Sequence, residues 1–64
     1  MRPEDVIIKL IQKETERNGG YVYEPRIIKM ATLLNISPDR YERIRERLIE
    51  NKKLGKEGMK LFLL

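Results

Sequence analysis

The 64-residue sequence contains no cysteine, no histidine and no tryptophan. Disulfides and thiolate metal sites are therefore excluded, and the most common general base and metal ligand of proteins is missing as well. A zinc site made of carboxylates alone would be unusual. There is also no glycine-rich phosphate loop and no Gly-x-Ser-x-Gly turn. We therefore expect neither an enzyme nor a bound metal or cofactor.

Long hydrophobic runs are also lacking, since the longest comprises only Leu61–Leu64. Such a run cannot span a membrane, and the N-terminal residues MRPEDV lack the hydrophobic region of a secretory signal. A chain of this length holds at most one domain, which buries only about 60% of the surface that the unfolded chain exposes. We expect a single cytoplasmic domain with one small core and no deep pocket.

Charged residues, by contrast, are abundant. The 14 Lys and Arg residues outnumber the 10 Asp and Glu residues, and the net charge is +4. This modest excess permits binding to a polyanion without requiring it. Abundant Lys, Glu, Arg and Ile together with the absence of cysteine are typical of proteins from thermophiles, so we expect a heat-stable protein.

Hydrophobic spacing predicts two helices and a short strand in the first half of the chain. Pro3 is a favourable first helical residue, and hydrophobic residues recur after it at helical spacing, so a helix is expected over residues 3–18. The aromatic and β-branched residues 21–23 predict a brief strand. A second helix is expected over residues 25–34. Its hydrophobic stripe comprises Ile27, Ile28, Ala31 and Leu34.

A turn and a third helix are predicted for residues 35–51. Asn35 is suited to the left-handed conformation that ends a helix. Ser37 is a favourable N-cap and Pro38 a favourable first residue, which predicts a helix over residues 38–51. Its hydrophobic stripe follows helical spacing and is expected to be buried. The stripe comprises Tyr41, Ile44 and Leu48.

The hydrophobic period changes to that of strands in residues 53–63. The two glycines of GKEG, residues 55–58, are suited to a hairpin turn. The strand at residues 21–23 can pair with this hairpin and cover its edge. Alternate residues of the last strand are expected to face the core, namely Met59, Leu61 and Leu63. Phe62 and Leu64 are expected to point the other way, out from the core.

This order of elements resembles the winged helix-turn-helix family, most clearly in KMATLLNISPDRYERIRERLIENKKL, residues 29–54. Ala31 stands where the family packs a small residue between two helices, and Asn35 stands where it usually has glycine. Two departures are Arg45, at a position often hydrophobic in the family, and Asn51-Lys52, in place of a glycine. The resemblance implies an α+β winged helix, with three helices, a short strand and a C-terminal hairpin called the wing. The alternative is a three-helix bundle with a disordered tail.

The resemblance implies a transcription regulator of archaeal, bacterial or viral type that binds double-stranded DNA, and we expect it to be a dimer. Such a domain places its third helix in the major groove, where arginine binds guanine or phosphate. The arginines of one helix face are Arg40, Arg43 and Arg47. Phosphate contacts are expected from the start of the third helix, the wing and the second helix. These residues are Ser37, Lys52, Lys53, Lys56, Lys60, Arg26 and Lys29.

The same charges also fit a helix that is merely exposed to solvent. Residues 38–51 carry four arginines and four acids. Ion pairs are expected within this helix at Asp39–Arg43, Arg43–Glu46 and Arg47–Glu50. Lysines on a hairpin edge also prevent association between sheets. The side chains of Tyr21 and Tyr23 could stack on a base, but such residues more often pack a short strand onto the core.

A winged helix used for protein contact is the main alternative function, as a docking module in a larger assembly of the replication or membrane-remodelling type. The neutral third helix and the hydrophobic last strand favour this reading. Phe62 and Leu64 are then the expected partner surface. The chain could also be one domain of a larger protein. A continuous positive strip from the third helix to the wing would favour DNA, whereas mixed charges would favour docking.

Overall fold

The computed structural model describes residues 2–64 and shows three helices and a three-stranded antiparallel sheet. The elements in chain order are α1 (Pro3–Arg17), β1 (Val22–Tyr23), α2 (Glu24–Leu33), α3 (Pro38–Glu50), β2 (Leu54–Glu57) and β3 (Lys60–Leu63). The expected α+β winged-helix arrangement is confirmed, and the alternative with a disordered tail is wrong. The expected bounds differ from the observed ones by at most one residue. None of the helices within residues 2–64 is long and hydrophobic enough to cross a membrane.

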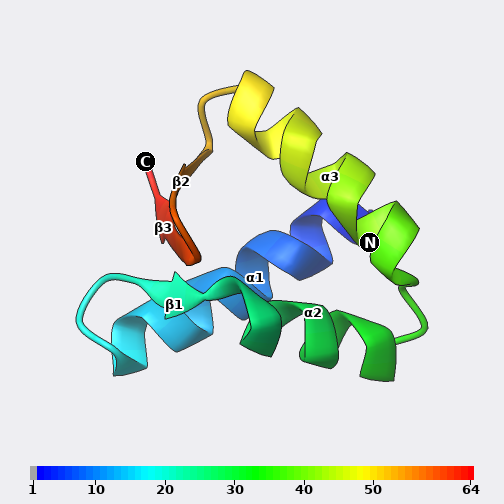
Figure 1. Ribbon diagram of the computed structural model, residues 1–64, viewed down its shortest axis with the longest axis horizontal. Coiled ribbons are helices and arrows are strands. Elements are labelled where there is room, and N and C mark those ends of the chain that lie inside the picture. The colour runs from blue at the N-terminus through cyan, green and yellow to red at the C-terminus, as the bar shows by residue number, and fades with distance from the viewer. Residues whose placement is uncertain (1) are drawn as a thin grey trace.

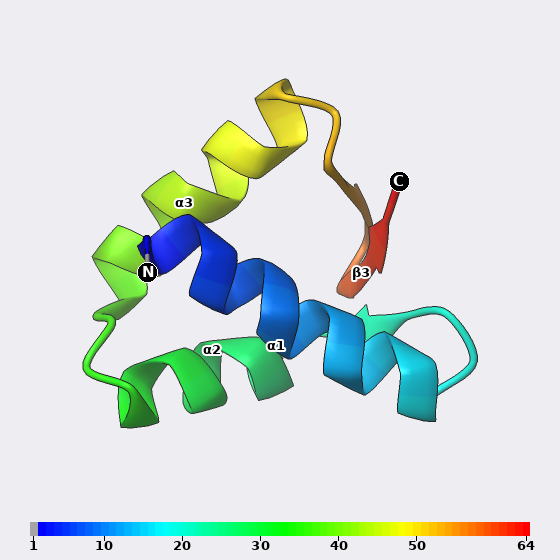
Figure 2. The same ribbon diagram turned by 180° about the vertical axis from the view of Figure 1, so that it is seen from behind.

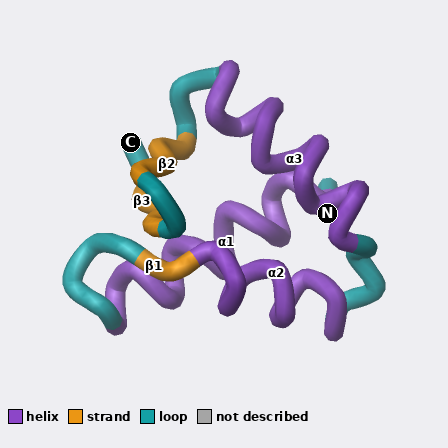
Figure 3. The backbone as a smooth tube through the Cα atoms, in the orientation of Figure 1, coloured by secondary structure: helices purple, strands orange, loops and turns teal. Residues whose placement is uncertain are grey.

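The three helices enclose the core, and the sheet closes one end of it. In the view of Figure 1, α1 lies behind α2 and α3, and the hairpin lies at the left. The view from behind places α1 in front of the other two helices (Figure 2). A short loop joins α2 to α3, and a second loop leads from the end of α3 into the hairpin (Figure 3). The wing therefore follows directly from the helix expected to enter the groove.

The sheet has the strand order β1-β3-β2, so β3 is its central strand. The short β1 pairs with β3, with Val22 opposite Leu61. The strand near residues 21–23 therefore covers one edge of the hairpin, as expected. Leu54 lies opposite Leu63 on the other side of β3. Val22, Leu54 and Leu61 are buried, and Leu63 packs against them. One sheet face therefore belongs to the core, and the other faces outward.

The core contains hydrophobic residues from every helix and strand. Its buried members are Ile7, Ile11, Val22, Ile27, Ala31, Ile36, Tyr41, Leu48, Leu54 and Leu61. Two residues expected in the core are outside it. Leu34 is 52% exposed, because α2 ends at Leu33 and the chain turns away there, and Met59 is 60% exposed, because it lies in the hairpin turn before β3.

The turn between α2 and α3 has the backbone geometry expected from its sequence. Asn35 adopts a φ of 65°, in the left-handed region, which asparagine tolerates better than most residues. Ser37 caps α3, since its Oγ accepts a hydrogen bond from the backbone N–H of Arg40 at 3.3 Å. At the other end of α3, Lys52 has a φ of 57°. Lysine thus occupies the left-handed conformation for which glycine is usual after a helix.

Candidate nucleic-acid interface

The outermost row of α3 is mostly acidic. Helical spacing places Asp39, Arg43, Glu46 and Glu50 on one line, on the side of the helix opposite the buried Tyr41 and Leu48. All four side chains are exposed. We call these four residues the outer row. A helix-turn-helix presents this side of its recognition helix to the major groove, and here that side carries three carboxylates and one guanidinium.

The arginines expected to read the groove lie together on one flank of α3, turned toward the start of α1. A shallow groove of about 250 Å³ is lined there by Pro3, Glu4, Arg40, Arg43, Ile44 and Arg47. Arg47 Nη1 donates a hydrogen bond to Glu4 Oε1 at 2.9 Å. We call Arg40, Arg43 and Arg47 the arginine flank. The structure brings these three side chains together as expected, but α1 supplies a carboxylate that neutralises one of them.

The ion pairs expected along α3 are not formed among residues 2–64. Arg47 pairs with Glu4 of α1 in place of Glu50, and Arg45 pairs with Glu46. Arg40 and Arg43 have no acidic partner in the described part of the chain. Spacing along one helix did not predict these pairings, because the competing carboxylates come from other elements or from the adjacent position.

The four lysines around the hairpin form the most basic segment of the surface. Lys52, Lys53, Lys56 and Lys60 are all exposed, and within residues 2–64 none of them forms an ion pair. Glu57, the one acid among them, lies opposite Lys60 in the ladder. Lys60 Nζ lies 4.9 Å from the centre of the ring of Tyr21, the residue just before β1, and makes a cation–π contact with it. We call the four lysines the wing lysines.

Two expected phosphate contacts, Arg26 and Lys29, lie on α2, apart from the groove beside the arginine flank. Arg26 Nε donates to Glu14 Oε1, and the Glu14 side chain is only 3% exposed. Arg17 also lies within ion-pair distance of Glu14, at 3.8 Å. Arg26 therefore compensates a buried carboxylate, which reduces its availability for phosphate. Lys29 is exposed but does not line the groove beside the arginine flank.

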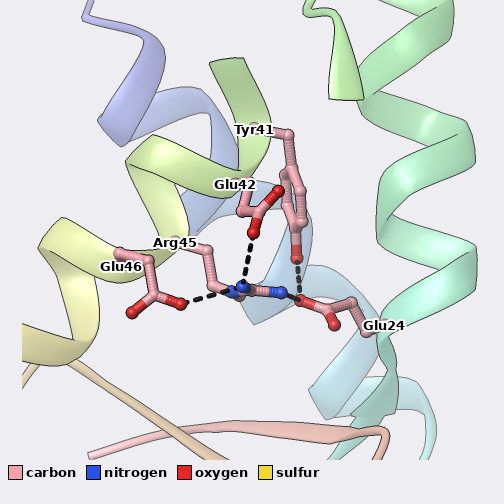
Figure 4. A network of polar contacts seen from close by, with 5 residues as sticks. All are labelled: Glu24, Tyr41, Glu42, Arg45 and Glu46. Atoms are coloured by element: carbon pink, nitrogen blue, oxygen red, sulfur yellow. Dashed lines mark hydrogen bonds and ion pairs between the residues drawn. The ribbon is translucent and has the colours of Figure 1, made fainter. Parts of the chain in front are cut away.

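A polar network that the sequence did not predict joins α3 to the first residue of α2 (Figure 4). Glu24 Oε2 accepts hydrogen bonds from the Tyr41 hydroxyl at 3.0 Å and from Arg45 Nη1 at 2.8 Å. Arg45 Nη2 also donates to Glu46 Oε1 at 2.8 Å. A carboxylate from α2 thus compensates the charge of Arg45 on the core side of α3.

This network shifts two pKa values. Burial raises the pKa of the Tyr41 hydroxyl, and the nearby Glu24 carboxylate raises it further. The hydrogen bond to Glu24 raises the pKa of Arg45, which stays charged. Arg45 Nε is buried without a hydrogen-bond partner. The sequence contains one sign of this network. Arg45 lies one turn after Tyr41 on the core side of α3, where a charge requires a partner of opposite charge. This sign does not identify Glu24 as the partner.

The expected partner surface on β3 divides into two different environments. Phe62 is partly buried, because its ring covers Gly55 on the neighbouring strand. A Cβ atom at Gly55 would lie 2.1 Å from the Phe62 ring. Leu64 is 72% exposed. The expectation that both residues point away from the core is compatible with this geometry, but only Leu64 is freely exposed.

Comparisons with known protein families, curated proteins and solved structures return no match to this chain. Over residues 2–64 there is no group of three or more acidic side chains placed to hold a metal ion. The arginine flank, the outer row and the wing lysines are therefore the surface features that bear on function.

Proposed function

We propose that this protein binds double-stranded DNA, with the wing lysines as the main contact and Arg40 and Arg43 as the second. The observation that carries the proposal is a concentration of exposed cations on α3 and around the hairpin that directly follows it. Six of them lie in this part of the chain, and none of the six has an acidic partner in the described residues. They are Arg40, Arg43, Lys52, Lys53, Lys56 and Lys60.

The outer row constrains how α3 can approach DNA. Asp39, Glu46 and Glu50 would repel phosphates if the helix entered the groove along its outermost line. The favourable approach is therefore tilted, with the arginine flank toward the bases and the wing along one phosphate backbone. In this arrangement Arg43 contacts a base edge, since bidentate pairing to guanine is the common specific contact of arginine. The lysines contribute affinity without sequence information.

A duplex-binding titration at two salt concentrations tests the proposal. Five phosphate contacts, from Arg40 and the four wing lysines, predict that the affinity falls about five-hundredfold between about 50 mM and 200 mM salt. Lys56→Ala should weaken binding to all sequences alike and lower the salt slope by about one, whereas Arg43→Ala should relax sequence preference. Lys9→Ala is the matched control, because Lys9 is exposed on the outward side of α1. Equal effects of Lys9→Ala and Lys56→Ala, or no duplex binding at low salt, would refute the proposal.

The second candidate function is that of a docking module, which binds a protein surface carrying both acidic and basic residues. The outer row favours it, because three carboxylates beside one guanidinium group suit a partner of mixed charge better than a uniform polyanion. In this case Glu46→Lys should abolish partner binding, whereas it should strengthen duplex binding if the first proposal holds. The two functions thus predict opposite signs for the same substitution.

A further inference from the structure

The outward face of the sheet carries aromatic rings between lysines. The register places Tyr23 opposite Lys60, and Lys60 opposite Glu57. The next outward position on β3 is Phe62, which lies opposite Gly55. Because side chains alternate between the two faces of a strand, these residues share the face that the core does not use. We call Tyr21, Tyr23, Lys60 and Phe62 the sheet platform.

The rings of the platform are held in place but remain accessible. Tyr21 and Tyr23 meet edge to face, with ring centres 5.6 Å apart and an interplanar angle of 83°. Lys60 Nζ covers the Tyr21 ring at 4.9 Å, and Gly55 leaves room for the Phe62 ring on the neighbouring strand. Tyr23 is 52% exposed. The Tyr23 ring is therefore open to a ligand on the outside, and the partly buried Phe62 ring leaves part of its surface accessible.

The charges around the platform favour a polyanion as the ligand. Lys60 lies within it, and Lys53 lies beside its far end, where the Leu64 backbone N–H donates to the Lys53 carbonyl oxygen at 3.2 Å. Glu57 is the single acid in the hairpin. A purely hydrophobic partner would leave these ammonium groups desolvated, at a high free-energy cost. A ligand with flat hydrophobic rings and a negatively charged backbone satisfies both parts of the surface.

We propose that the sheet platform binds unpaired bases of single-stranded nucleic acid. Tyr23 and Phe62 would stack on two neighbouring bases, and Lys53 and Lys60 would contact the phosphates between and beside them. Aromatic rings on a sheet face combined with basic residues are a sequence-tolerant way to bind single strands. The proposal goes beyond duplex binding and shares with it only the lysines of the wing.

Substitutions at Tyr23 test the platform directly. The probe is a labelled oligothymidylate of about 16 nucleotides. Tyr23→Ala should lower its affinity about tenfold, while Leu33→Ala, which shortens an exposed side chain on α2, should leave it unchanged. Tyr23→Trp should retain binding. Because the chain has no tryptophan, the new indole is the only one present, and the oligonucleotide should quench its fluorescence.

The outcomes separate this proposal from duplex binding. Arg43→Ala should weaken duplex binding and leave the oligothymidylate affinity unchanged, whereas Tyr23→Ala should do the reverse, with both variants checked for folding by circular dichroism. Equal oligothymidylate affinities of Tyr23→Ala and the wild type, or an unquenched indole in Tyr23→Trp, would overturn the platform. A third result would also overturn the proposal: the protein is a dimer, and Tyr23→Ala makes it a monomer without loss of oligothymidylate binding. The sheet platform would then bind a second copy of the chain.

Discussion

Arg45 Nη1 lies 2.8 Å from Glu24 Oε2, and this ion pair joins the middle of α3 to the first residue of α2. The Tyr41 hydroxyl donates to the same oxygen, so that two side chains of α3 converge on one carboxylate. The side chains of Arg45 and Glu24 are 15% and 11% exposed. The network thus links the two helices of the helix-turn-helix on the side of α3 away from the arginine flank.

Removal of the arginine alone should destabilise the fold. Arg45→Met leaves the Glu24 carboxylate largely buried with one donor fewer, and we expect a loss of about 2 kcal/mol in the free energy of unfolding. The double variant Glu24→Gln with Arg45→Met should recover most of this loss, because no charge then remains buried and the amide oxygen can still accept the Tyr41 hydrogen bond. Urea unfolding of the single and double variants measures both effects. If the double variant loses as much as the two single variants together, Glu24 and Arg45 are not coupled.

Tyr41 should make stability fall at alkaline pH. Its pKa is raised in the folded state, whereas in the unfolded chain it is about 10. The stability that the neutral Tyr41 hydroxyl contributes is therefore complete below about pH 10. It is lost progressively above about pH 10, because the tyrosine of the unfolded chain then releases its proton while that of the folded protein does not. Between about pH 9 and about pH 11 the wild type should lose roughly 1.4 kcal/mol more than Tyr41→Phe. Parallel loss in both proteins, measured by urea unfolding, would contradict the assignment.

Replacement of Gly55 by even the smallest side chain should destabilise the protein. Gly55→Ala places a Cβ against the Phe62 ring, so the ring must leave its position over the strand. The expected loss is about 1 kcal/mol of stability, because the ring is displaced but the backbone can stay. In the Phe62→Ala background the same substitution should cost nothing, since alanine has a higher strand preference than glycine. Thermal unfolding of the wild type, the two single variants and the double variant measures the coupling between Gly55 and Phe62. An equal loss of stability from Gly55→Ala in both backgrounds would exclude this coupling.

Glu4 should weaken the contribution of Arg47 to duplex binding. Glu4→Gln removes the carboxylate that pairs with Arg47 at 2.9 Å, and if the proposed function holds, duplex affinity should rise severalfold at low salt. The effect on stability should be within about 1 kcal/mol, because Arg47 is largely exposed. Asp5→Asn is the matched control for charge, since Asp5 lies on the same turn but forms no ion pair within residues 2–64. A rise of the same size in both variants would reflect net charge alone.

The local signals in the sequence determined the elements of this fold. Asn35 and Ser37 specify the turn before α3 because left-handed backbone and side-chain capping depend only on neighbouring atoms. The spacing of Tyr41 and Leu48 identified the buried side of α3 because a helix repeats every 3.6 residues. For the same reason, residues at the ends of elements were predicted less well. Leu34 and Met59 fit the hydrophobic period, but each lies just outside its element.

Only the tertiary structure decided which residues far apart in sequence meet. Arg45 pairs with Glu24 of α2, and Arg47 pairs with Glu4 of α1. No spacing along α3 could indicate these two partners, because their positions depend on how the three helices pack. The same packing turned the arginine flank toward α1 and left acids on the outer row. The sequence determined that α3 carries equal numbers of arginines and acids, and the fold determined which of those charges face outward and which are already paired.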